Sequence, residues 1–135
     1  MLKAMVQEDN DFWAERSLEF SDLRLEVDLE QEPPVYFWKD QFGHLVRIPK
    51  YFFLGADSST TSFIIEGLEH YSENQLFIYD KFGILVGQWS LYNNTWKGAT
   101  TDGSFLPSDR YFFRLSLPPI QEALRGFFYL IRLDE

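Results

Sequence analysis

The sequence predicts an all-β fold, a single antiparallel Ig-like β-sandwich of about seven strands. Phe, Tyr and Trp make up 19% of the 135 residues, and aromatic side chains favour pleated, half-buried surfaces. Several short segments alternate apolar and polar residues, which is the period of a strand with one buried face. Turn signals recur roughly every 8 to 12 residues in the second half of the chain, a spacing typical of a sandwich. A chain of this length forms one hydrophobic core.

The composition excludes several classes of function. The chain has no cysteine, so disulfides, thiol catalysis and thiolate metal sites are excluded. Its net charge of −9 argues against nucleic acid as a partner, because binding phosphates needs clustered Lys and Arg. No apolar run approaches the length of a membrane-spanning helix, and we expect no direct membrane insertion.

The leading segment, residues 1 to 34, carries ten acidic and three basic residues, for a net charge of −7. It is expected to form a short helix within 8 to 20 and a strand over 23 to 29, where apolar and charged residues alternate. Pro33-Pro34 ends this strand. The segment would therefore add one or two strands to the sandwich of residues 35 to 135. Its charge indicates a solvated face or, less favoured, a surface that meets a partner.

No secretory signal opens the chain. A signal peptide needs an apolar region of about seven or more residues. Here the polar residues Gln7 and Glu8 follow the first six residues, so no such region forms. We therefore expect the chain to be a fragment or a mature form of a longer protein.

Two hairpins are predicted, over residues 35 to 48 and 76 to 89. In the second, Asp80 can bind the turn backbone and Gly83 can take a positive φ, as a type I turn followed by a bulge requires. Six of the eleven positions from 36 to 46 are identical to those 40 positions later. The identity is consistent with an internal duplication or with convergence on one turn chemistry.

Later elements follow the same alternation. Over residues 111 to 113, Tyr111 and Phe113 are expected on one side of a strand and Phe112 on the other, which leaves one face for a partner. Residues 120 to 124 are expected to form one helical turn capped by glycine. The apolar run 127 to 133 predicts a buried strand.

No arrangement of residues indicates catalysis, and the protein is not expected to be an enzyme. His44 and His70 have no neighbouring serine or acid pair and are interpreted as turn or surface residues. Glu66 and Glu69 are close in sequence, but nothing nearby would separate their pKa values. Trp96 is compatible with a sugar-stacking platform, although packing between two sheets is the favoured interpretation.

Five motifs occur in a recognisable order over residues 48 to 132. They are Ile48-Pro49-Lys50-Tyr51-Phe52 closing on Phe63-Ile64-Ile65, then Tyr79 to Val86, Tyr92 to Gly98, Asp102 to Phe113, and Gly126 to Arg132. This order resembles the C-terminal sorting domain of gliding-motility-associated proteins, the type B cargo domain of the type IX secretion system of Bacteroidota.

The resemblance implies a non-enzymatic C-terminal domain that directs a larger secreted or cell-surface protein through the periplasm and outer membrane. The implied partner is the type IX machinery, as an outer-membrane translocon or an accessory outer-membrane barrel. The residues that carry the family motifs, for fold or recognition, are Asp57, Tyr79, Asp80, Phe82, Gly83, Tyr92, Asn94, Trp96, Gly98, Gly103, Leu106, Pro107, Tyr111, Gly126 and Arg132. Two alternatives remain, an adhesin-like module that binds carbohydrate or protein, and a structural subunit of a surface or secretion assembly docked by strand addition.

The chain also departs from the family pattern. Residues 54 to 61 replace a loop rich in Asn, Asp and Gly and retain one carboxylate, Asp57. Because Ca²⁺ takes six to eight oxygen ligands, we expect no metal and no cofactor. Lys97 stands where the family has an acidic residue, and Asp109-Arg110 where it has Gly-Thr.

Overall fold

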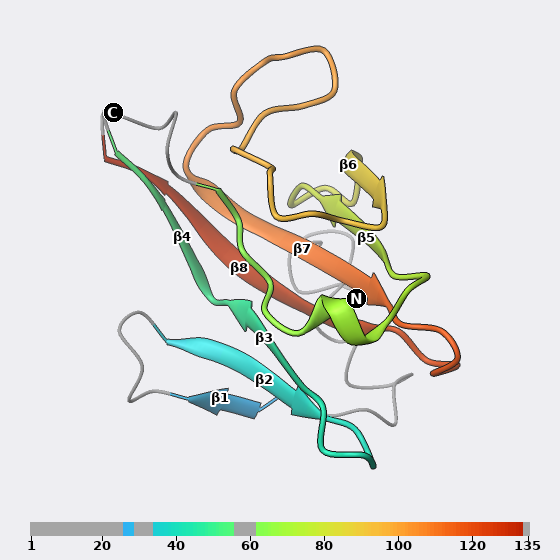
Figure 1. Ribbon diagram of the computed structural model, residues 1–135. Helices are drawn as coiled ribbons and strands as arrows, with labels where there is room; N and C mark the ends of the chain where they lie inside the picture. The colour runs from blue at the N-terminus through green and yellow to red at the C-terminus, as the bar shows by residue number, and fades with distance from the viewer. Residues whose placement is uncertain (1–25, 29–33, 56–61, 134–135) are drawn as a thin grey trace.

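The computed structural model describes residues 26–28, 34–55 and 62–133. They form eight strands in two sheets (Figure 1). The smaller sheet has the order β1-β2-β3 and is antiparallel. Its strands are β1 (Glu26–Asp28), β2 (Val35–Lys39) and β3 (Leu45–Pro49).

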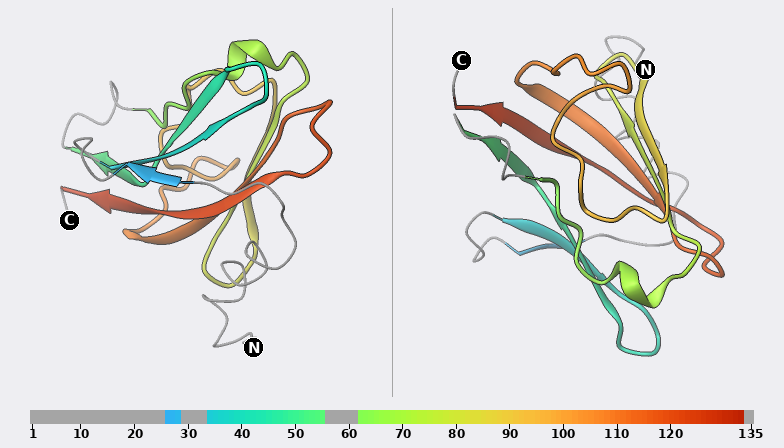
Figure 2. Two further views of the ribbon diagram at one scale, coloured as in Figure 1. Left: turned by 90° about the horizontal axis from the view of Figure 1, so that it is seen from below. Right: turned by 45° about the horizontal axis from the view of Figure 1, so that its top comes forward.

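The larger sheet has the order β4-β8-β7-β5-β6. Its strands are β4 (Tyr51–Leu54), β5 (Gln75–Tyr79), β6 (Leu85–Ser90), β7 (Asp109–Ser116) and β8 (Leu124–Arg132). All neighbours are antiparallel except β4 and β8, which are parallel. Only Lys50 separates β3 from β4, so one run of chain crosses from the smaller sheet to the larger one, as the views in Figure 2 show.

The hydrophobic core lies between the sheets. Strand β7 contributes Tyr111, Phe113 and Leu115 to this core. These three residues pair in register with residues of β8 that face the same side of the sheet. From the smaller sheet Val46 and Ile48 point into it, and both are fully buried. Phe112 lies on the opposite face of β7, as predicted. It is buried too, so the expectation that this face is left for a partner is wrong at this position. The prediction of an all-β sandwich is therefore confirmed, with eight described strands and one parallel pair that the sequence did not indicate.

Both predicted hairpins form. In each tip the first turn residue, Asp40 or Asp80, accepts a backbone hydrogen bond from the glycine three positions later. The glycines Gly43 and Gly83 have φ of +89° and +83°, which explains the choice of residue. The Asp80 N–H donates to the carbonyl of Ile84 at 2.9 Å, so Gly83 and Ile84 both face Asp80 and the predicted bulge after the turn is present. A separate shift in the β5–β6 register lies between Ile78 and Tyr79.

The predicted helical turn at 120 to 124 is wrong. Ile120 donates to the carbonyl of Leu117 in a tight turn, and Leu124 already begins β8, opposite Leu115. Strand pairing of the apolar residues therefore overrides a marginal local preference. The helix of the described region is instead the 3₁₀ segment η2 (Leu68–His70).

The structure describes only part of the leading segment, so only some of the predictions made for it can be compared with the structure. The proposed helix at 8 to 20 lies outside the described residues. Of the predicted strand, residues 26–28 form β1, and Val27, expected on its buried face, is 37% exposed. Among the described residues, no helix has the length and apolarity that a membrane crossing requires.

Candidate functional site: the motif residues on the fold

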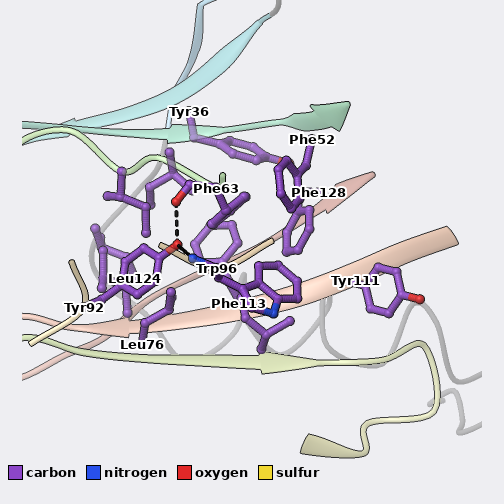
Figure 3. Packing of buried hydrophobic residues seen from close by; sticks show 14 of the residues in the cluster. Tyr36, Phe52, Phe63, Leu76, Tyr92, Trp96, Tyr111, Phe113, Leu124 and Phe128 are labelled. Atoms are coloured by element: carbon purple, nitrogen blue, oxygen red, sulfur yellow. Dashed lines mark hydrogen bonds between the residues drawn. The ribbon is translucent and has the colours of Figure 1, made fainter. Parts of the chain in front are cut away.

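Trp96 lies in the core, as favoured from the sequence. It is 5% exposed, and its ring lies within 6.1 Å of the rings of Phe52, Phe63, Trp89 and Phe128, measured between centroids (Figure 3). Its indole Nε1 donates to the carbonyl of Ala99 at 2.7 Å. This burial leaves no open ring face for a sugar.

Tyr92 and Asn94 join the loop after β6 to the segment that precedes η2. The Tyr92 hydroxyl donates to the carbonyl of Phe63 at 2.5 Å and accepts from the backbone N–H of Trp96 at 3.2 Å (Figure 3). Burial raises the pKa of Tyr92, so the hydroxyl keeps its proton. Asn94 has φ of +65°, and its Oδ1 accepts from the N–H of Ile65 at 2.9 Å. Both residues therefore position backbone rather than a ligand.

Arg132 fastens the last strand to the loop before β7. Its Nε donates to the carbonyl of Leu106 at 2.5 Å, and its Nη2 donates to that of Gly98 at 3.1 Å. Its backbone N–H donates to Ser108 Oγ at 2.8 Å, and the guanidinium carbon lies 5.0 Å from the centre of the Phe105 ring. Arg132, the basic residue that ends the family motif, therefore has a structural role, because its guanidinium donates hydrogen bonds to two backbone carbonyls.

Gly98 and Gly103 serve different needs in this loop. Gly98 has φ of +82°, and a Cβ there would lie 2.8 Å from Leu54 Cδ1, so both conformation and space require glycine. Gly103 has φ of +90° with nothing within 4 Å of a built Cβ. It turns the small hairpin in which Ala99 bridges Phe105.

Tyr111 forms a corner at the start of β7. Its hydroxyl donates to the carbonyl of Pro107, four residues upstream, at 2.8 Å, and its ring stacks on Phe128. A tyrosine that hydrogen-bonds back to the chain in this way is a hallmark of Ig-like sandwiches. Gly126 lies opposite Phe113 in register, and the Phe113 ring meets that of Tyr36 at 5.9 Å.

The sequence matches the CHU_C type IX secretion signal domain over residues 46–130. The chain belongs to this family. No curated protein and no solved structure matches it. The match covers nearly the same stretch as the resemblance found in the motifs, so that identification is confirmed. A type IX secretion signal domain is a sorting domain of secreted or cell-surface cargo, and the type IX secretion system is its partner in general terms.

The β5–β6 tip is an exposed part of the family motifs. Asp80 Oδ1 accepts from the N–H groups of Phe82 and Ile84, each at 2.9 Å. The side chain of Phe82 is 66% exposed, with Lys81 Nζ 5.5 Å from the ring centre. Lys81 also pairs with Asp109 at 3.0 Å, which ties the tip to β7. In this type IX secretion signal domain the tip is held at its base by hydrogen bonds and an ion pair and is apolar at its end.

Asp57, the remaining motif residue, lies outside the described residues. Within the ranges that the structure describes, no group of three or more His, Asp and Glu is arranged to hold a metal ion.

A polar cluster that was not predicted from the sequence surrounds the first hairpin. Asp40 Oδ1 accepts from the N–H groups of Phe42 and His44 at 2.8 and 2.9 Å. Its Oδ2 accepts from the Tyr71 hydroxyl at 2.6 Å and lies 3.1 Å from His44 Nδ1. The rings of His44 and His70 stack with centroids 4.0 Å apart. The repeated turn motif was the available signal, but it could not indicate Tyr71, 31 residues away.

Asp40 is expected to make stability depend on pH. Burial acts to raise its pKa, but hydrogen bonds from Tyr71, His44 and Phe42 outweigh burial and lower the pKa to about 2, from an ordinary 3.8. The ionised form therefore contributes stability that is present above about pH 4 and lost as the pH falls toward 2. Urea unfolding between pH 5 and pH 2 should show a steeper loss for the natural protein than for Asp40→Asn.

A second variant tests the cause. Tyr71→Phe removes one of the hydrogen bonds that hold the charge, so its loss of stability in the same range should be intermediate. Parallel curves for the natural protein and Asp40→Asn would contradict this account of Asp40.

Proposed function

We propose that this chain is a non-enzymatic sorting domain that directs a larger protein through the type IX machinery to the cell surface or the medium. The observation that carries the proposal is the family match over residues 46–130. The larger cargo protein and its surface destination follow from that role.

The placement of the motif residues supports recognition of a folded domain rather than of a linear peptide. Tyr92, Trp96, Leu106 and Tyr111 are buried, and Arg132 is bound to two carbonyls. Their side chains are therefore used to build the sandwich and are not offered to a partner. A receptor for this domain would bind a surface of the folded sandwich that these residues stabilise.

The adhesin alternative loses one support, the use of Trp96 as a platform for a sugar, because that ring is enclosed by core aromatics. Its other support, the altered loop around Asp57, lies outside the described residues. We therefore retain sorting as the proposed role.

The test is export of a reporter. The whole chain, residues 1–135, is fused behind a periplasmic signal peptide and a fluorescent protein in a Bacteroidota host with an active type IX system. A shorter fusion from residue 48 is unsuitable, because Tyr36 and Val46 belong to the core. We expect the reporter at the surface or in the medium, and in the periplasm when the domain is omitted. Retention of the full fusion, while a typical family domain is exported in the same strain, would refute the sorting role.

A further inference from the structure

The β6 strand forms one edge of the larger sheet (Figure 1). It pairs with β5 from Gln75–Ser90 to Tyr79–Leu85. On its other side, no segment of the described chain makes a strand or bridge pairing with it. Alternate residues of such a strand direct N–H and C=O groups away from the sheet, ready to pair with another extended chain.

This edge lacks several of the features that usually protect an outer strand. Natural edges are blunted by charged residues, proline, short length or a bulge, and the irregularity in β6 lies only near its beginning, where its register with β5 shifts between Ile78 and Tyr79. The six residues of β6, from Leu85 to Ser90, contain no charged residue and no proline. By contrast β1, an outer strand of the smaller sheet, has three residues, and two of them are acidic. β4, at the opposite edge of the larger sheet, has four residues, and the loop that follows it lies outside the described residues.

A groove of about 300 Å³ runs between β6 and the segment 95–101. That is roughly the liquid volume of ten water molecules, enough for one large side chain. Gly87 and Trp89 line it from the strand, and Trp96, Lys97 and Thr101 from the other side. The Trp89 ring covers Gly87, where a Cβ would lie 2.5 Å from the indole. An edge with which no described segment pairs, beside a side-chain groove, provides both components of a strand-addition site.

We propose that the β6 edge receives an extended segment of the type IX machinery by strand addition, with one large side chain of that segment in the groove. This inference rests on the proposed sorting role. The edge supplies backbone hydrogen bonds, and Trp89 and Thr101 favour a side chain that combines an apolar body with a polar tip. A second copy fits less well, because its Trp89 covers its own Gly87 and brings no large side chain to the groove.

Two variants of the full-length fusion test the edge and the groove separately. Gln88→Lys combined with Ser90→Lys places charges on the exposed outer strand, and Thr101→Trp fills the groove from an exposed position. The control for the Gln88→Lys part of the change is Gln75→Lys, one lysine at an exposed site on β5, which is paired on both sides. At unchanged melting temperature, we expect at least tenfold less export for both variants and normal export for the control.

The outcomes separate this inference from the sorting role. Normal export of both variants would overturn the edge proposal and leave the sorting role intact. Retention of the unmodified fusion would overturn both. Equal loss of export for Gln75→Lys would also overturn the edge proposal, because the effect would not be specific to the outer strand.

A crosslinking experiment detects contact between β6 and the type IX machinery directly. Because the chain has no cysteine, Gln88→Cys or Gln75→Cys gives a single site for a benzophenone maleimide. The probe is detergent-solubilised outer membrane from the secreting host and from a strain without the translocon. We expect an adduct from position 88 that requires the translocon and far less from position 75. Equal adducts from both sites, or a purified dimer that Gln88→Lys with Ser90→Lys dissociates, would overturn the proposal.

Discussion

Gly67→Ala is expected to destabilise the domain by about 4 kcal/mol, several times the cost of Gly43→Ala. Gly67 has φ of +98°, and a Cβ at this position would lie 2.1 Å from the backbone oxygen of Leu45. The left-handed conformation costs about 1 to 2 kcal/mol for a residue with a side chain, and overpacking typically adds about 1 to 3 kcal/mol. We expect the upper part of that range because the opposing atom belongs to a strand backbone.

The neighbouring hydrogen bonds prevent easy relief of this clash. Arg47 and Glu66 exchange two backbone hydrogen bonds of 3.0 Å, which hold the residue before Gly67 against β3. Gly43 is the matched control, since its φ is +89° and nothing lies within 4 Å of a built Cβ. Urea unfolding of both variants measures the difference. Similar costs at the two sites would show that conformation alone accounts for the effect and that β3 yields to the added methyl group.

The local elements of this fold could be predicted because their causes lie within a few residues. Asp80 and Gly83 define a turn by side-chain hydrogen bonding and positive φ, and the same chemistry at Asp40 and Gly43 identified the first hairpin. The alternation at 111 to 113 correctly assigned Tyr111 and Phe113 to the core face.

The features of the fold that could not be predicted depend on contacts between residues that are distant in sequence. The parallel pairing of β4 with β8 joins residues nearly 80 positions apart, and no local pattern indicates it. Arg132 was recognised as a motif residue, but its two carbonyl partners are 26 and 34 residues away. Asn74 is buried and accepts from the N–H of Tyr92, 18 residues on, although nothing in its sequence context sets it apart. The place of β6 at the edge of the described sheet also becomes visible only when the order of strands is known.

Trp96→Ala is expected to cost about 3 to 5 kcal/mol of unfolding free energy. The truncation removes ring contacts with four aromatic side chains and the hydrogen bond to Ala99. A surface aromatic provides the control: Phe42 is 74% exposed at a hairpin tip, so Phe42→Ala should change stability by no more than about 0.5 kcal/mol.

The same pair of variants links folding to sorting. If the machinery reads a folded surface, the Trp96→Ala fusion should lose export in proportion to its unfolded fraction, and the loss should diminish when the host grows at a lower temperature. Phe42→Ala should be exported normally. Circular dichroism melts of the purified domains and the export assay give the two measurements. A Trp96→Ala domain as stable as the natural one would show that the ring is not part of the core and would restore a ligand-binding role for it.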